Sequence, residues 1–151
     1  MCADQQTAQR AKIVRGGRYF EDFSIGDLYH HWPGRTISQS DYRLYCLITL
    51  NYHLDSIAIH PGYIYSLLLG LSMSDLSRNA IRHEELNILI GEQGMRCGDT
   101  LYAETEVLSR QSTPDDSRGG VVTLETRGFN QAGAPVMSYQ RRLTVRKAPE
   151  E

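Results

Sequence analysis

The sequence predicts an α+β fold in which a buried helix precedes an antiparallel sheet. In the C-terminal third, apolar and polar residues alternate along three separate segments, as they do in strands with one buried face. Ahead of these strands, residues 62–76 are apolar on most sides, which predicts a helix that is buried nearly all round. Another helix, predicted from apolar residues at helical spacing, comes before the buried one. Helices followed by a run of strands are typical of the α+β class.

The length of the chain favours one domain. A chain of 151 residues, of which 40% are hydrophobic, can bury one core but is short for two. Residues 1–17 are polar and end in Gly16-Gly17, so we expect a flexible leader there. The domain should then span residues 18–147, and residues 148–151 form a short tail.

Charge and hydropathy exclude several classes of partner. The formal net charge is −2 and the pI is near 6.2, with Lys and Arg scattered, which argues against a nucleic acid partner. No apolar run reaches the ~18–20 residues of a membrane span, and the N-terminus is too polar for a signal peptide. Three cysteines without a C-x-x-C pair fit a reducing compartment and give no structural zinc site. We therefore expect a cytoplasmic protein that contacts no membrane.

The N-terminal half is predicted to supply one strand and the first helix. Residues 19–27 carry aromatic and aliphatic side chains up to a Gly-Asp turn, and an extended piece follows through residues 32–34. Ser38 is a good helix cap, and Asp41 lies three residues later in the first turn. Leu44, Leu47 and Ile48 then recur at helical spacing, and Tyr45 is a further candidate for the same face. This spacing predicts a helix over residues 39–50.

The buried helix carries several small residues, namely Ser66, Gly70, Ser72 and Ser74. We expect these to let the strands of a curved sheet pack closely around the helix. Residues 81–90 follow as a strand, because Leu86, Ile88 and Ile90 recur at every second position.

The three C-terminal strands are predicted over residues 100–108, 120–129 and 134–145. The second and third are joined by residues 130–133, Asn-Gln-Ala-Gly, a good hairpin turn. A longer polar loop over residues 112–119 joins the first two strands. The result is an antiparallel meander.

The segment between the two helices carries candidate catalytic groups. It contains Asn51-Tyr-His-Leu-Asp55, and His60-Pro-Gly62 follows where the buried helix starts. A helix start offers unpaired backbone N–H groups and a partial positive charge, which suit an oxyanion. A histidine near its neutral pKa can move a proton. The combination predicts a site at the mouth of the buried helix.

Motifs along most of the chain resemble the MaoC-like dehydratase family. The resemblance covers residues 17–147 and rests on five stretches: Gly17-Arg-Tyr-Phe-Glu-Asp-Phe-Ser-Ile-Gly-Asp27, Gly34-Arg-Thr-Ile-Ser-Gln-Ser-Asp41, His53-Leu-Asp55, Gly98-Asp-Thr-Leu-Tyr-Ala-Glu-Thr-Glu-Val107 and Arg127-Gly-Phe-Asn-Gln-Ala-Gly133. It implies a hot-dog fold, in which a curved antiparallel sheet wraps a long buried helix. It also implies a homodimer, or a heterodimer, with substrate at the interface.

The chemistry implied by the resemblance is hydration or dehydration of an acyl thioester of coenzyme A or acyl carrier protein, without a cofactor or a metal. A histidine and an Asp or Asn flank a water, while a backbone N–H at the helix start holds the thioester oxygen. Enolate charge develops on that oxygen as the reaction proceeds, so a positioned donor helps most in the transition state.

Carried over to this sequence, the resemblance makes His53 the base and the Gly62 N–H the oxyanion donor. The motif is altered, because the family places an acid or amide five residues before the histidine, where this chain has Ile48. Pro61 is also inserted between His60 and Gly62. Asn51 or Asp55 would then orient the water.

Three further candidates, His60, Tyr52 and Tyr63, would line the substrate pocket. Structural alternatives stay open: Asn51 as a helix cap, Asp55 as a hydrogen-bond acceptor, and His60 as a turn residue before Pro61. The His30-His31 pair is interpreted as part of a surface loop, and His83 with Glu84-Glu85 as a solvated turn. Neither has the ligand spacing of a metal site.

Three functional hypotheses follow. The first is a hydratase or dehydratase of enoyl or 3-hydroxyacyl thioesters. The second is a remodelled hot-dog enzyme, either a thioesterase or a cyclase or isomerase of a specialised pathway, which the altered motif favours. The third is a non-catalytic subunit that binds an acyl ligand or pairs with an active partner chain.

Overall fold

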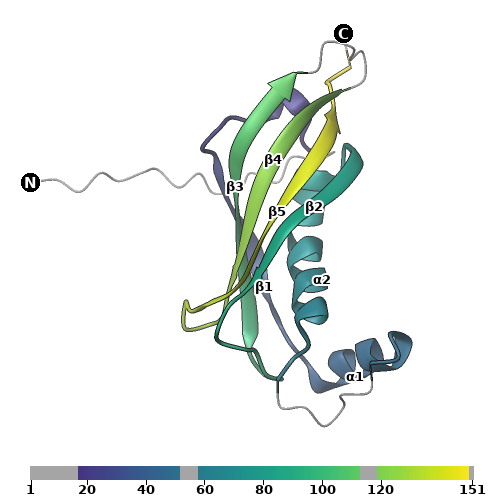
Figure 1. The fold of residues 1–151 in the computed structure, drawn as a ribbon, viewed down its shortest axis with the longest axis vertical. Helices are drawn as coiled ribbons and strands as arrows, with labels where there is room; N and C mark the ends of the chain where they lie inside the picture. The colour runs from purple at the N-terminus through teal and green to yellow at the C-terminus, as the bar shows by residue number, and fades with distance from the viewer. Residues whose placement is uncertain (1–16, 52–57, 113–118, 150–151) are drawn as a thin grey trace, which may run out of the picture.

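The computed structural model describes residues 17–51, 58–112 and 119–149, and the structural statements below concern those residues. A five-stranded antiparallel sheet curves around one long helix, α2 (Figure 1). This is the arrangement that the resemblance implied. In chain order, the elements are a 3-10 turn (Phe20–Asp22), β1 (Leu28–Thr36), α1 (Gln39–Ile48), α2 (Pro61–Ser72), a π-helical turn (Met73–Ser77), β2 (Ala80–Ile90), β3 (Thr100–Ser112), β4 (Gly119–Phe129) and β5 (Pro135–Arg146).

The predicted C-terminal strands are confirmed as the centre of the sheet. The strand order is β1-β3-β4-β5-β2, so β3, β4 and β5 form a meander and β1 and β2 are the two edges. Alternate side chains point towards α2, as the sequence pattern predicted, and Leu101, Leu124 and Leu143 are fully buried. In the turn before β5, the side chain of Asn130 accepts from the N–H groups of Ala132 and Ala134, each at 3.0 Å.

The buried helix is shorter and less enclosed than predicted. α2 ends at Ser72 and continues as the π-helical turn. Ser66, Gly70 and Ser74 are exposed, so the expectation that they face the sheet was wrong, whereas it is confirmed for Ser72, which is buried and accepts from Arg141 of β5. The close approach instead occurs at a glycine of the sheet: a Cβ on Gly128 would lie 2.7 Å from a methyl carbon of Leu68. One side of α2 is open in the single chain.

The first helix begins as predicted and projects from the body near the start of α2 (Figure 1). Ser38 caps it by accepting from the Asp41 N–H at 3.1 Å. Its buried side chains are Tyr42 and Cys46. The apolar residues that predicted the helix face outward, since Leu44, Leu47 and Ile48 are 59%, 58% and 73% exposed.

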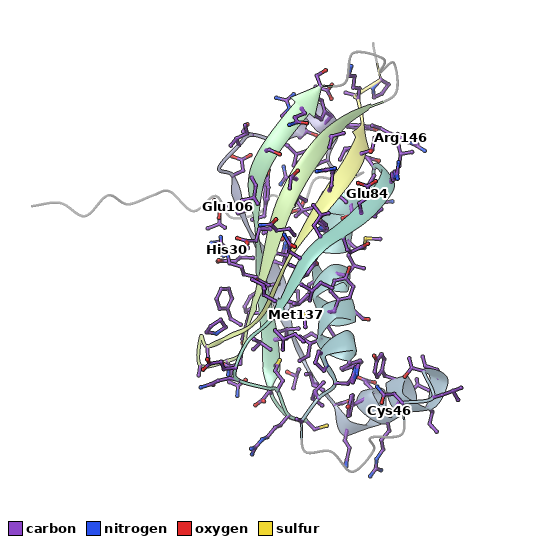
Figure 2. All side chains as sticks on the ribbon, in the orientation of Figure 1. His30, Cys46, Glu84, Glu106, Met137 and Arg146 are labelled. Carbon is purple, nitrogen blue, oxygen red and sulfur yellow. The ribbon has the colours of Figure 1, made fainter. Side chains whose placement is uncertain are left out.

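Two interpretations of histidines were wrong. His30 and His31 lie in β1, where the alternation of the strand sends them to opposite faces. His31 is buried and its Nε2 lies 2.8 Å from the Thr105 hydroxyl, whereas Figure 2 shows His30 on the side of the sheet away from α2. His83 and Glu84-Glu85 lie in β2 and not in a turn, because this polar run sits on an edge strand.

The remaining expectations concern chain ends and membranes. The leader, apart from Gly17, and the middle of the 112–119 loop fall outside the described residues, and the domain boundaries stay a prediction. Within the described part of the chain, no helix has both the length and the apolar character that crossing a membrane requires.

Candidate active site

The first free backbone N–H of α2 is already hydrogen-bonded within the chain. His60 is the cap, and its Nδ1 accepts a hydrogen bond from the Gly62 N–H at 3.1 Å. Pro61 follows at the first helical position, where a missing N–H costs nothing. The Tyr63 N–H donates to the His60 carbonyl at 3.0 Å. The Gly62 amide predicted to hold the thioester oxygen is therefore bonded to the exposed ring of His60.

Two tyrosines of α1 hold His60 from the other side. The Tyr42 hydroxyl accepts from the His60 N–H at 3.0 Å, and the Tyr45 hydroxyl lies 3.5 Å from His60 Nδ1. Tyr45 also lies against Gly62, because a Cβ there would be 2.7 Å from its hydroxyl oxygen. Tyr63 packs on both rings, with centroids 5.5 Å from Tyr42 and 5.0 Å from Tyr45. A phenol, an imidazole and a backbone amide thus converge at the helix start.

The protonation states of this group favour hydrogen-bond donation by the phenols. Burial raises the pKa of Tyr63, with a further contribution from Asp41. Burial also raises the pKa of Tyr42, although its hydrogen bond from the His60 N–H acts in the opposite direction. Because His60 Nδ1 accepts from Gly62, the proton of the neutral ring belongs on Nε2.

Asn51 ends α1 through its backbone. Its N–H donates to the Cys46 carbonyl at 2.9 Å, and the Leu50 N–H donates to the Leu47 carbonyl at 3.4 Å, which together form a Schellman motif. The residue in the left-handed conformation is Leu50, with φ of 56°. The cap is Thr49 and the left-handed residue is Leu50, so the interpretation of Asn51 as the helix cap was wrong, and the role of its side chain towards water stays a prediction.

The other predicted catalytic residues, His53 and Asp55, lie outside the described residues, as does Tyr52. The structure thus brings His60, Gly62 and Tyr63 together and leaves the placement of His53 untested. Sequence reasoning missed the contacts of Tyr42 and Tyr45 with His60. Their spacing of three residues on one helix, just before the histidine segment, was the available signal.

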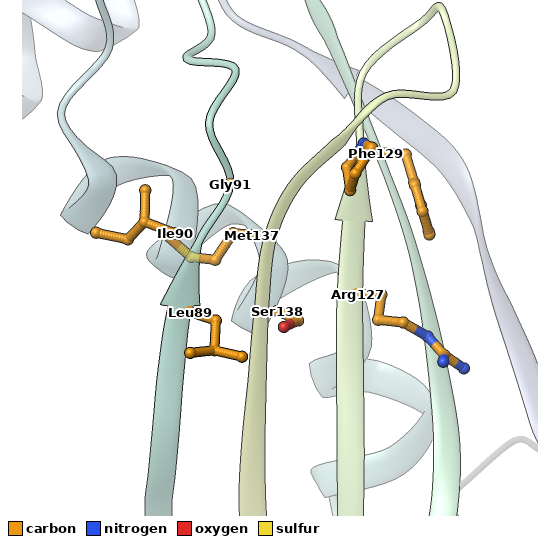
Figure 3. Close-up of a pocket in the computed structure, with 8 residues that line it drawn as sticks. Leu89, Ile90, Gly91, Arg127, Phe129, Met137 and Ser138 are labelled. Atoms are coloured by element: carbon orange, nitrogen blue, oxygen red, sulfur yellow. The ribbon is translucent and has the colours of Figure 1, made fainter.

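A pocket of about 200 Å³ lies elsewhere, where β4, β5 and β2 meet the turn before β5 (Figure 3). Its apolar lining includes Leu89, Phe129 and Met137, and Arg127 stands beside it. Arg127 forms ion pairs with Glu104, Glu106 and Glu125. The lining contains no histidine or carboxylate to move a proton, so this pocket is not a candidate for the acid-base site.

Comparison with known proteins relates this geometry to a family. The mesaconyl-CoA hydratase profile matches residues 92–147, which cover β3, β4 and β5. A crystal structure of a MaoC domain protein from Chloroflexus aurantiacus superposes with a TM-score of 0.80 at 27% identity, over 91% of this chain and 44% of that one. The chain belongs to the MaoC-like family of hot-dog proteins.

Two curated relatives of this MaoC-like chain bear the names of thioester enzymes. It is 31% identical over 149 residues to a mesaconyl-CoA hydratase of Cereibacter sphaeroides, covering 89% of this chain and 43% of that protein. It is also 31% identical over 150 residues to a beta-methylmalyl-CoA dehydratase of Chloroflexus aurantiacus, covering 87% and 41%. The chain therefore spans less than half the length of these relatives.

Proposed function

We propose that the chain is a hydratase or dehydratase of enoyl or 3-hydroxyacyl thioesters. The observation that carries this proposal is the helix start, where the Gly62 N–H, the His60 ring and the Tyr45 hydroxyl converge. In the sequence, His53 precedes this helix start by seven residues. The names of the relatives favour coenzyme A over a carrier protein as the thioester handle.

In this mechanism the thioester oxygen accepts from the Gly62 N–H and replaces His60 Nδ1 there. The exposed His60 ring has to turn aside for this exchange, and the Tyr45 hydroxyl is then positioned as a second donor. His53 takes a proton from a water held by Asn51 or Asp55 as the water oxygen bonds to the β-carbon. The enolate charge falls on the thioester oxygen, and return of the proton from His53 to the α-carbon completes the addition and restores the neutral imidazole.

The experiment that tests the reaction uses crotonyl-CoA. Hydration removes the conjugated double bond, and its absorbance should fall in the presence of the protein and not in the presence of His53→Ala. His83→Ala, on the edge strand β2, serves as the matched control and should retain activity. Release of free thiol without loss of the double bond would point to a thioesterase instead. Absence of both changes would overturn the proposal for the chain on its own.

We also propose that the chain works as a dimer, with a second hot-dog unit supplied by another copy. Two observations support this: α1 exposes an apolar face, and β1 and β2 are sheet edges. The altered motif, with Ile48 in place of an acid, favours a heterodimer with an active partner chain as the alternative. Cys46 and Cys97, the cysteines among the described residues, are free, which fits the cytoplasm as the compartment.

A further inference from the structure

The single tryptophan of the chain lies on the outer face of the sheet, the face away from α2. Trp32 follows the buried His31 in β1, so the alternation of the strand turns it to the side of His30, which Figure 2 shows away from α2. It is 80% exposed. One exposed apolar side chain is ordinary, so the residues around Trp32 decide whether it belongs to an interaction surface.

An apolar band extends from Trp32 across the outer face. Tyr102 of β3 is 37% exposed and lies opposite Phe129 of β4, which in turn lies opposite Pro135 of β5. Leu89 of β2 is 66% exposed and lines a pocket together with Phe129 and Pro135 (Figure 3). The band exposes on the order of 500 Å², since a large aromatic side chain alone carries about 150–250 Å². An uncharged patch of this size often marks an interaction site.

The pocket beside the band has the size of one side chain. Its volume is about 200 Å³, whereas pockets for a whole small ligand measure about 300–1,000 Å³. It opens on the outer face, because it is lined by Arg127 and Ser138, which lie opposite each other and each follow and precede buried residues (Figure 3). A bulky side chain from a partner therefore fits this pocket better than a free ligand does.

Trp32 and the pocket lie at one level along the strands, on opposite sides of the middle strand. The pairing of β1 with β3 sets Trp32 level with Tyr102, which is level with Phe129 and then with Pro135. The strand order β1-β3-β4-β5-β2 makes β4 the middle strand. A twofold axis parallel to β4 and in front of Phe129 would place Trp32 of one copy over the pocket of another. The reverse contact would form at the same time, so the pairing closes.

We infer that the outer face binds a second copy of the chain, with Trp32 of each copy in the pocket of the other. The partner is a copy because one chain carries both the projecting side chain and the matching pocket, as a self-complementary contact requires. The contact goes beyond the proposed dimer, since Figure 1 shows α1 on the α2 side of the sheet. Two dimers joined by their outer faces would form an assembly of four chains.

The strength of this contact follows from its area and its charge. Two bands together bury on the order of 1,000 Å², which is at the low end for a specific interface. Dimers should therefore prevail at low concentration and pair as concentration rises. Arg127 lies beside the band with three carboxylates, those of Glu104, Glu106 and Glu125, so this cluster is negative and repels its copy. Salt screens such repulsion and should strengthen the contact.

The test uses Trp32 as its own probe, because fluorescence of the only tryptophan reports on this residue alone. Light scattering and tryptophan emission are measured from about 1 µM to about 1 mM protein. The mass should rise from two chains to four, while the emission shifts to shorter wavelength and quenching by acrylamide falls in parallel. Added salt should move this transition to lower concentration.

Leu89→Lys decides whether Trp32 enters the pocket of the other copy. Leu89 is exposed and lies on β2, the edge opposite to Trp32 in its own copy, so the variant changes the pocket and leaves the tryptophan intact. It should raise the concentration of half-assembly at least about tenfold and remove the emission shift below that concentration. Ile25→Lys, at an exposed apolar residue in the turn before β1, is the matched control and should keep both signals.

A mass that stays constant over the whole range would overturn the inference. An assembly of four chains without an emission shift, or a shift that Leu89→Lys leaves intact, would also overturn it, since Trp32 would then lie elsewhere. Protection of Trp32 at constant mass, seen only with crotonyl-CoA, would assign the face to a ligand instead. A rise from one chain to two that carries the shift would keep this contact and overturn only the dimer through α1.

Discussion

The Gly62 N–H donates to Nδ1 of His60 at 3.1 Å, so two residues assigned to substrate binding are bonded to each other. This bond satisfies the one donor that the helix start would otherwise offer to a thioester oxygen. A substrate must therefore compete with the side chain of His60. The competition links the stability of the helix cap to the affinity for substrate.

Replacing His60 by Ala should weaken the fold and strengthen substrate binding. The loss of the side-chain cap should lower the free energy of unfolding by about 1 kcal/mol. The freed Gly62 N–H should lower KM for crotonyl-CoA severalfold with little change in kcat. Urea denaturation and steady-state kinetics measure the two effects. His60→Asn keeps an acceptor at the cap and should stay close to the parent in both. A raised KM in His60→Ala would instead mean that the ring itself binds substrate.

Acidification should destabilise the protein through His31. Burial first, and then Arg141 and His30, lower the pKa of His31 from 6.5 to about 4 in the folded state. Between these values the unfolded chain binds a proton that the folded chain does not, so stability falls as pH drops from 6.5 to 4 and this effect ends below pH 4. The loss should be about 3 kcal/mol.

The measurement for His31 is urea denaturation over that pH range. His31→Gln lacks the titrating ring, so its stability should depend less on pH than that of the parent. His30→Gln removes the smallest of the three causes and should keep most of the parent's slope. Equal slopes in the parent and His31→Gln would contradict the buried neutral state.

Replacement by Ala should change stability in opposite directions at two glycines, Gly128 of β4 and Gly70 of α2. A Cβ on Gly128 would meet Leu68 at 2.7 Å, so Gly128→Ala should cost about 1–3 kcal/mol through overpacking. Gly70 has nothing within 4 Å, and Gly70→Ala should stabilise the helix by about 0.5–1 kcal/mol. Thermal unfolding of the two variants checks both signs. Destabilisation by Gly70→Ala would reveal a tight contact on the open side of α2.

The meander of β3, β4 and β5 was predictable because its signal is local, whereas the places of β1 and β2 at the two edges of the sheet were not predicted. Side chains alternate along β3 and β4, and Asn130 and Gly133 mark the turn between β4 and β5. The orientation of α1 was not predictable, since a helical spacing of Leu44, Leu47 and Ile48 shows a face without showing what covers it. Burial of Tyr42 and Cys46 on the other face depends on where α1 sits against α2.

The candidate site was only partly predictable for a related reason. His60 and Gly62 are neighbours in sequence, and the resemblance located them at a helix start. Their bond to each other depends on the ring conformation that Pro61 and the α1 tyrosines impose, which no spacing encodes. The buried Arg141 was missed because its position in β5 follows the inward alternation only once the register is known.

The exposed apolar face of α1 should become buried when the chain dimerises. Leu47→Lys combined with Ile48→Lys places two charges on this face without touching the buried Tyr42 and Cys46. Light scattering should show a dimer for the parent and a monomer for this double variant, because buried lysines would lose their hydration. Ile25→Lys, at a residue 67% exposed in the turn before β1, is the control and should remain a dimer. A double variant that stays dimeric would exclude α1 from the interface.

Substitution of Arg141 tests whether its buried guanidinium holds the end of α2 to the sheet. Arg141→Met keeps the length of the side chain and removes a buried charge, so the free energy of unfolding should stay the same or rise by about 1–4 kcal/mol. Ser77→Ala leaves the guanidinium in place without one acceptor and should instead cost about 1–3 kcal/mol. Chemical denaturation of both variants gives the comparison. A large loss of stability in Arg141→Met would show that the hydrogen bonds of the guanidinium to Ser72 and Ser77 hold the end of α2 to the sheet, whereas unchanged or raised stability would show that packing of a long side chain is sufficient there.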